Sequence, residues 1–145
     1  MDRGRTASKR HLICDGGGLP LAPPLLTAAN INDYGMLLPL LDQIAASRPS
    51  GGRLVLADRG YDARAVRDGI SERGHEPRIP KRNPPCAGKQ RDSLARERAV
   101  IERTFAWLSW MRRLATRWER RDDLHLAFLT LGCALICWRR LQHAF

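Results

Sequence analysis

A short apolar run that ends in an aspartate, Leu54-Val-Leu-Ala-Asp58, places the strongest limit on how this chain can fold. An unbroken apolar run of this length is typical of a strand that is buried on both faces, whereas a half-buried strand alternates apolar and polar residues. Strands of that kind belong to sheets with helices on both sides. We therefore expect a strand over 53–57 within an α/β fold, with Asp58 at its carboxyl end.

The segments around this run alternate between strand and helix patterns. Residues 11–26 are typical of a β-hairpin, because the turn Asp15-Gly-Gly-Gly18 offers the backbone angles of tight turns. A helix is expected from Asn32 or Asp33 to about 46, a helix over 63–73 and a strand over 76–79. The remaining parts are a basic lead-in at 1–10, a basic proline-rich loop at 80–92 and two long helices at 93–145, the second capped by Asp122 or Asp123. The pattern predicts one α/β domain with a mixed sheet and an all-helical carboxyl-terminal third.

The charge of the chain points to a phosphate-bearing partner. The net charge is +10, and arginine supplies most of the cations, since only Lys9, Lys81 and Lys89 are lysines. The planar guanidinium group donates paired hydrogen bonds that match phosphate oxygens. We therefore favour a nucleic-acid partner. The alternative is a basic surface that reflects only a GC-rich genome.

The cysteines do not form a metal-binding pattern of the CxxC kind. They are Cys14, Cys86, Cys133 and Cys137. The first residues are charged rather than apolar, so we expect no secretory leader and free, cytosolic thiols. A metal site made by Cys133, Cys137, His125 and His143 is the alternative to buried thiols on an apolar helix. The apolar run over 126–138 is too short to span a membrane and predicts a core helix.

Two carboxylates stand out as candidates for chemistry. Asp58 follows the apolar strand, and functional groups gather at the carboxyl ends of strands in α/β sheets. Glu102 lies in a helical pattern in which Arg98, Ser109 and Arg113 fall within about 40° of it. The alternatives are an Arg98–Glu102 ion pair on an ordinary helix surface and a turn role for Asp58. Asp15, Asp33 and Asp62 are assigned to turns or helix caps.

Magnesium chemistry would need more than these two side chains. Mg²⁺ prefers octahedral oxygen ligation from two or three carboxylates together with waters and substrate phosphate. Two ions about 3.5–4 Å apart can activate the attacking oxygen and stabilise the leaving one. Asp58 and Glu102 alone cannot balance the charge of such a pair. A third carboxylate is therefore expected on chemical grounds.

Three blocks of the sequence carry a resemblance to a known family. They are Arg5-Thr-Ala-Ser-Lys-Arg-His-Leu12 with Asp15-Gly-Gly-Gly-Leu-Pro-Leu21, then Ala57-Asp-Arg-Gly-Tyr-Asp62, then Arg98-Ala-Val-Ile-Glu-Arg-Thr-Phe-Ala-Trp-Leu108 with its arginine-rich continuation to Arg121. In this order they resemble the DDE transposases of bacterial insertion sequences, in the group whose second acidic block reads Asp-x-Gly-Tyr-Asp. Together the blocks cover nearly the whole chain.

The resemblance implies a ribonuclease-H-like fold with an Asp-Asp-Glu triad that binds Mg²⁺ or Mn²⁺. Asp58 would be the second member of the triad and Glu102 the third. Such enzymes cleave transposon ends by water attack and join the freed 3′-hydroxyl to target DNA. The candidate DNA contacts are Lys81, Arg82, Arg98, Arg103, Arg113 and Arg117. The family also implies homo-oligomers in the bacterial cytoplasm, associated with the nucleoid when bound to DNA, and no membrane partner.

The chain departs from the family pattern at two places. The third block has Ala95 and Ser109 where the family often has tyrosine and lysine, and Arg113 lies one turn past Ser109 as a substitute cation. The first aspartate of the family lies on a strand upstream of Ser8, and neither Asp2 nor Asp15 matches it. We therefore expect the carboxyl-terminal part of a transposase, inactive alone, with the first central strand supplied by an upstream polypeptide.

Two other functions remain open from the sequence. The chain could be a non-catalytic DNA-binding remnant that interferes with a full-length transposase, or a basic accessory protein of a nucleoprotein particle. The second gives no reason for the two acidic blocks to occur together. The tryptophans Trp107, Trp110, Trp118 and Trp138 have helical spacing, which favours core or partner contacts over stacking on flipped bases.

Overall fold

A computed structural model describes residues 8–47, 52–81 and 91–142 of the chain, with the backbone alone for 45–47 and 91–97. The chain divides into two compact units. Unit 1 comprises residues 1–30 and 99–145, and unit 2 comprises residues 31–98. Each unit carries one of the two candidate carboxylates, Glu102 in unit 1 and Asp58 in unit 2, and each is described by itself.

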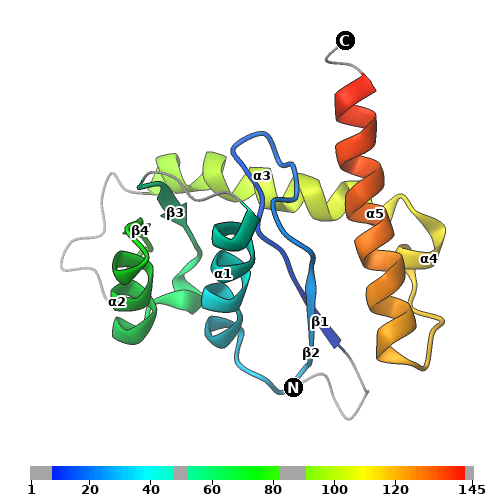
Figure 1. Cartoon of the computed structure of the whole chain (residues 1–145), viewed down its shortest axis with the longest axis horizontal. Helices are drawn as coiled ribbons and strands as arrows, with labels where there is room; N and C mark the ends of the chain where they lie inside the picture. The colour runs from blue at the N-terminus through cyan, green and yellow to red at the C-terminus, as the bar shows by residue number, and fades with distance from the viewer. Residues whose placement is uncertain (1–7, 48–51, 82–90, 143–145) are drawn as a thin grey trace. The chain divides into compact units, whose positions relative to one another are not determined.

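Unit 1 begins with an antiparallel hairpin. Strand β1 (Ser8–His11) pairs with β2 (Leu25–Ala28), so that Ser8 lies opposite Ala28 and His11 opposite Leu25 (Figure 1). We predicted the first strand at 11–14, whereas the structure places it at 8–11, so that it begins within the predicted basic lead-in. The residues between the strands keep one isolated bridge, Cys14 to Pro20. Prolines at 20, 23 and 24 cannot donate ladder hydrogen bonds, which explains why regular pairing resumes only at Leu25.

Residues 91–142 contain three helices rather than the two expected, and the first of them begins in unit 2 and ends in unit 1. They are α3 (Arg91–Ser109), α4 (Arg112–Ala115) and α5 (Asp122–Gln142). The chain leaves the helical conformation at Met111, whose φ and ψ are −81° and 114°. The prediction that Arg113 continues the Glu102 face of one long helix is therefore wrong. Trp118, expected on the apolar side of that helix, is 73% exposed after α4.

The core of unit 1 lies where α3, α4 and α5 meet. Its buried residues are Leu108, Leu114, Leu129, Cys133 and Ile136, with Leu12, Leu19 and Leu26 of the hairpin region packed against them. Helix α5 was expected to be a core helix, and one face of it is. At 21 residues, it is also long and apolar enough to cross a membrane, a test that core helices of soluble proteins pass as well.

Unit 2 contains a two-stranded parallel sheet with helices. Its elements are η1 (Asp33–Met36), α1 (Leu37–Ser47), β3 (Leu54–Leu56), η2 (Arg59–Tyr61), α2 (Arg64–Glu72) and β4 (Glu76–Arg78). Strands β3 and β4 pair with Leu54 opposite Glu76, and α2 is the crossover between them (Figure 1). Helices α1 and α2 contact each other, and Arg73 holds Asp42 of α1 through two hydrogen bonds of 2.6 and 2.9 Å.

Strand β3 is covered on one face only. Val55 is buried, whereas Leu54 and Leu56 on the other face are 46% and 44% exposed. The expectation that this strand is buried on both faces is therefore wrong. The described strands also form two separate pairs, β1–β2 and β3–β4, instead of one mixed sheet. The α/β class is confirmed at this coarser level.

Candidate functional site

Asp58 lies at the carboxyl end of β3, where the strand leads into the short helix η2. Its carboxylate oxygen Oδ1 accepts a hydrogen bond of 2.8 Å from the backbone N–H of Gly60 and so caps η2. The side chain is exposed. The other oxygen, Oδ2, has no partner among the described residues. The turn role and a ligand role are therefore compatible in this one side chain.

Gly60 allows the close approach of this carboxylate. A Cβ atom at Gly60 would lie 2.9 Å from Asp58 Oδ1, closer than ordinary van der Waals contact. A larger residue would push the Asp58 side chain away from the backbone N–H that holds it. The glycine of the Asp-Arg-Gly-Tyr block thus helps to set the orientation of Asp58.

The residues after Gly60 anchor this turn to the rest of unit 2. Tyr61 is partly buried, and its burial, with Asp33 and Asp58 nearby, raises the pKa of its hydroxyl to about 12. Tyr61 therefore remains a neutral donor at neutral pH. Asp62 ends η2 and accepts hydrogen bonds of 3.1 and 2.7 Å from Arg67, which also donates to Ile79 O. The turn-or-cap assignment of Asp62 is confirmed.

Glu102 lies in the middle of α3 and is exposed to solvent. Arg98 precedes it by one helical turn, but the two form no ion pair in the described part of the chain. Ser109, on the same helix face, donates its hydroxyl to Phe105 O instead. The ordinary ion-paired helix surface is therefore not what the structure contains at this position.

Thr104 anchors α3 beside Glu102, a role that no pattern in the sequence indicated. Its fully buried hydroxyl donates a 2.8 Å hydrogen bond to the carbonyl of Gly18 in the hairpin turn and lies 3.2 Å from Val100 O. Gly18 has a φ of +87°, and a Cβ there would lie 3.0 Å from Thr104 Oγ1. The turn itself is fixed by Asp15, which accepts hydrogen bonds from Gly17 and Leu19. The turn assignment of Asp15 is thus confirmed.

A complete metal site is not assembled among the described residues. No group of three or more His, Cys, Asp or Glu side chains there could hold an ion. Asp58 and Glu102 belong to different units, so the structure assigns no distance between them. As hard oxygen donors without cation partners in the described ranges, both suit Mg²⁺ or Mn²⁺ individually. Two carboxylates alone are fewer than such a pair of ions needs, so the third carboxylate stays a prediction.

The candidate DNA-contacting residues differ in whether their side chains already form ion pairs with acidic residues. Lys81 and Arg98 are exposed, and Arg103 is exposed with its guanidinium 5.6 Å from the centre of the Trp107 ring. Arg82 lies outside the described residues. Arg113 and Arg117, by contrast, have acidic partners, Glu119 and Asp122. Any phosphate contact by these two would compete with ion pairs that exist already.

A buried polar pair lies beneath Arg113. Glu119 accepts a 2.9 Å hydrogen bond from Arg113 through Oε1, while its Oε2 lies 3.7 Å from His125 Nδ1, beyond hydrogen-bonding distance. Among the residues that the structure describes, neither Oε2 nor Nδ1 has a hydrogen-bond partner. Burial, together with the charges of Arg117 and Arg10, lowers the pKa of His125. His125 is therefore neutral at pH 7, and it holds no metal with Cys133 or Cys137 in the described part of the chain.

The described thiols are free and protonated. Cys14, Cys133 and Cys137 form no disulfide. Burial raises the pKa of all three, that of Cys133 to about 12. The expectation of buried thiols on an apolar helix is confirmed for Cys133. Cys86 and His143 lie outside the described ranges.

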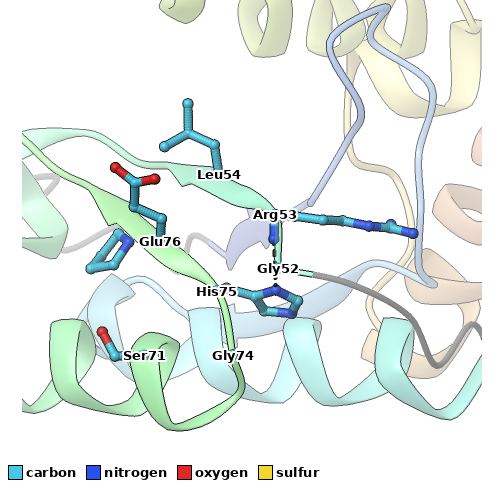
Figure 2. Close-up of a pocket in the computed structure, with 8 residues that line it drawn as sticks. Gly52, Arg53, Leu54, Ser71, Gly74, His75 and Glu76 are labelled. Carbon is cyan, nitrogen blue, oxygen red and sulfur yellow. Dashed lines mark hydrogen bonds between the residues drawn. The ribbon is translucent and has the colours of Figure 1, made fainter.

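A hollow of about 410 Å³ lies at the other end of β3 from Asp58. Figure 2 shows its lining, in which the backbone N–H of Arg53 donates to His75 Nδ1 over 3.3 Å. The lining comes from the starts of β3 and β4, from the last turn of α2 and from the turn after it. It includes neither Asp58 nor Glu102, so this hollow is not part of the candidate site.

An acidic side chain at a strand end, a second on a helix and an arginine-rich chain are together typical of α/β proteins that process nucleic acids. Comparison with known proteins identifies the family. The profile described as "Transposase DDE domain" matches residues 2–137. A curated putative transposase for insertion sequence element IS402 of Burkholderia cepacia is 48% identical over 149 residues, covering 99% of this chain and 68% of that protein. The chain belongs to the DDE transposases of insertion sequences. No solved structure matches it.

Proposed function

We propose that this chain is the carboxyl-terminal part of a DDE transposase, with Asp58 and Glu102 as the second and third acidic residues of the active site. The observation that carries the proposal is that both are exposed carboxylates without cation partners in the described ranges, although the chain is rich in arginine. Each lies in the acidic block expected of the family, whose profile matches 2–137. An exposed, unpaired carboxylate retains the oxygen lone pairs that a metal ligand needs.

The metal would be held by Asp58, Glu102 and one further carboxylate. Members of the family use divalent ions, and Mg²⁺ or Mn²⁺ suits this set of oxygen donors. When bound, the ions would supply an activated attacking oxygen and stabilise the leaving one during DNA cleavage and strand transfer. The hydrogen bond from Gly60 N–H orients Asp58 for this role, and the Thr104–Gly18 bond fixes the helix that presents Glu102.

The third carboxylate would come from a strand that pairs with the free edge of β3. Strand β3 has β4 on one side and no described strand on the other, and its Leu54 and Leu56 are exposed. A parallel strand added there would end beside Asp58, because carboxyl ends of parallel strands meet at one edge of a sheet. Unpaired edge groups also favour such an addition. An upstream polypeptide would supply this strand and its aspartate.

DNA would bind along the cations near the two carboxylates. Arg98 and Arg103 lie on α3 within one turn of Glu102, and both are exposed. Lys81 and Arg82, which follow β4 in the sequence of unit 2, would add phosphate contacts. Arg113 and Arg117 remain candidates that would share their charge with Glu119 and Asp122. The partners would be the element ends and the target DNA, bound by a homo-oligomer in the cytoplasm and, when on DNA, in the nucleoid.

The decisive test is cleavage of an element end by the joined polypeptide in the presence of Mg²⁺ or Mn²⁺. We expect Asp58→Ala and Glu102→Ala each to abolish cleavage while DNA binding persists. Asp68→Ala is a matched control, because Asp68 is an exposed carboxylate of α2 whose partner is Arg64 rather than a candidate site residue. Full cleavage by either site variant, or loss in the control alone, would contradict the assignment.

The isolated 145-residue chain should behave differently from the joined protein. We expect no metal-dependent nicking, because the described residues offer no three-ligand group. Weakly specific DNA binding should persist and fall steeply with salt concentration, since arginine–phosphate contacts release counterions. If the joined protein also fails to cleave but the chain inhibits a full-length transposase, the alternative of a non-catalytic DNA-binding remnant is supported.

A further inference from the structure

Helix α5 has apolar residues on two opposite faces, and only one of them is buried within unit 1. The inner face carries His125, Leu129, Gly132, Cys133 and Ile136, all buried. The outer face forms what we call the α5 stripe: Leu124, Ala127, Leu131, Ala134, Leu135, Trp138 and Leu141, all exposed. At about 100° per residue the stripe is centred roughly opposite the buried face.

The stripe has the spacing of a helix-pairing seam. Leu124, Leu131 and Trp138 recur every seven residues, and alanine or leucine recurs at the intervening positions 127, 134 and 141. These alternating steps of three and four residues are those of the first and fourth heptad positions, which pack against a partner helix. Leu131 is 65% exposed and Trp138 is 59% exposed, so a large apolar surface lies in water. Contiguous apolar surface of this kind marks an interaction site.

We propose that the α5 stripe is an interface with a second copy of this chain, in which the two α5 helices pack antiparallel around Leu131. The inference adds to the proposed function, which names a homo-oligomer but no surface through which its copies meet. The stripe contains neither Asp58 nor Glu102 and needs no metal or DNA. A two-fold axis makes the same stripe serve both copies, so the surface must be self-complementary.

The side chains along the α5 stripe are self-complementary in this arrangement. With Leu131 against its own copy on the axis, Leu124 lies level with the partner's Trp138, and the small Ala127 lies level with the partner's Leu135. Large and small side chains thus alternate across the seam. Because the register is centred on residue 131, the apolar stripe is covered over nearly its whole length.

The charges at the helix ends select the antiparallel direction. Asp122 and Asp123 begin α5, and Arg139 and Arg140 lie in its last turn. The two aspartates remain 79% and 62% exposed despite ion pairs with Arg117 and Arg121. An antiparallel pair keeps the Arg139–Arg140 ends of the two copies apart, level with the partner's Asp122 and Asp123, and opposes the two helix dipoles. A parallel pair would bring the like-charged ends together.

The first experiment measures the mass of the whole chain in solution by sedimentation. We expect a reversible dimer, and we expect Leu131→Glu to weaken it on the order of a hundredfold, because a charge would be buried at the centre of the interface. Trp110→Glu is the matched control: Trp110 is 81% exposed in unit 1 but lies outside α5. It should leave the dimer unchanged, and circular dichroism should show equal helix content in all three proteins.

The second experiment tests the register by disulfide cross-linking, with the parent chain as the baseline for its own cysteines. Leu131→Cys should cross-link to itself. Leu124→Cys should not, but a mixture of Leu124→Cys and Trp138→Cys should give a new dimer. Self-cross-linking of Leu124→Cys would show a parallel pair and overturn the proposal.

Three results would overturn the dimer itself. A monomeric parent chain with intact helix content would show that a second copy does not cover the stripe. A dimer that survives Leu131→Glu would place the interface elsewhere. Binding of the chain to phosphatidylcholine vesicles, lost in Leu131→Glu while the parent stays monomeric in solution, would assign the stripe to a membrane surface instead.

Discussion

The two units hold their candidate carboxylates by different means. In unit 2, Asp58 is fixed by its own turn, through the N–H of Gly60 only two residues away. In unit 1, Glu102 lies on a helix that is fixed by a contact across the chain, from Thr104 to Gly18, which are 86 residues apart. Asp58 therefore depends on local backbone geometry, whereas the position of Glu102 depends on the packing of the hairpin against α3.

The cores of the two units also differ in whether they are built from distant or from neighbouring parts of the sequence. The unit 1 core brings together residues from α3, α4 and α5, with apolar residues of the hairpin region around them. Unit 2 packs a two-stranded sheet with helices from the same continuous segment, 31–98. Unit 1 thus needs both ends of its sequence to fold. A change at either end of the chain should affect Glu102 before it affects Asp58.

The largest expected effect separates the two cores. Leu108→Ala in unit 1 and Ile70→Ala in unit 2 each remove a fully buried side chain and should each cost about 2–5 kcal/mol. Amide exchange should show the loss of protection confined to the unit that carries the substitution. If both variants destabilise both units equally, the two units unfold as one and the comparison fails.

A smaller effect is expected from the bond that positions Glu102. Thr104→Val removes the donor to the buried Gly18 carbonyl and should destabilise unit 1 by about 1–3 kcal/mol. Thr130→Val is the matched control, because the Thr130 hydroxyl donates only to Leu126 O within its own exposed helix turn. The control should change stability by less than about 0.5 kcal/mol. Equal effects in chemical denaturation would remove the special role of Thr104.

The corresponding change near Asp58 should be local rather than destabilising. Gly60→Ala would place a Cβ against Asp58 Oδ1, and the exposed side chain can rotate away, so the stability change should stay below about 1 kcal/mol. The backbone N–H at position 60 should then exchange faster than in the parent chain. Gly35→Ala, where a Cβ meets nothing within 4 Å, should leave amide exchange at position 60 unchanged. Unchanged protection in Gly60→Ala would contradict the proposed clamp.

The sequence predicted these local features better than the long-range ones. The turn at Asp15, the strand that ends at Asp58 and the stop at Gly74, whose φ is +73°, all follow from short-range rules. The prediction that Leu54 and Leu56 are buried was wrong, because the burial of a strand depends on which elements cover it and not on its own sequence alone. The break at Met111 was also missed, since the apolar spacing continues across it.

The candidate site shows the same division. Asp58 and Glu102 could be predicted from the sequence because each carboxylate lies in a recognisable block. Their roles and the third ligand stay predictions. Thr104 could not be found in this way, since its partner, the carbonyl of Gly18, is a backbone group far away in the chain. The ion pair of Arg113 with Glu119 was not predicted, because we expected one helix to continue through Arg113.

The smallest expected effect concerns pH and belongs to unit 1. Burial and the charges of Arg117 and Arg10 lower the pKa of His125, so the unfolded chain binds a proton more readily than the folded one. Stability is therefore complete above the ordinary histidine pKa of about 6.5 and should fall as the pH drops below it. His125→Gln should flatten this decline in the amide exchange of α5, whereas His75→Gln, in unit 2, should not. A decline of the same slope in His125→Gln would place the acid sensitivity of unit 1 outside the pair of His125 and Glu119.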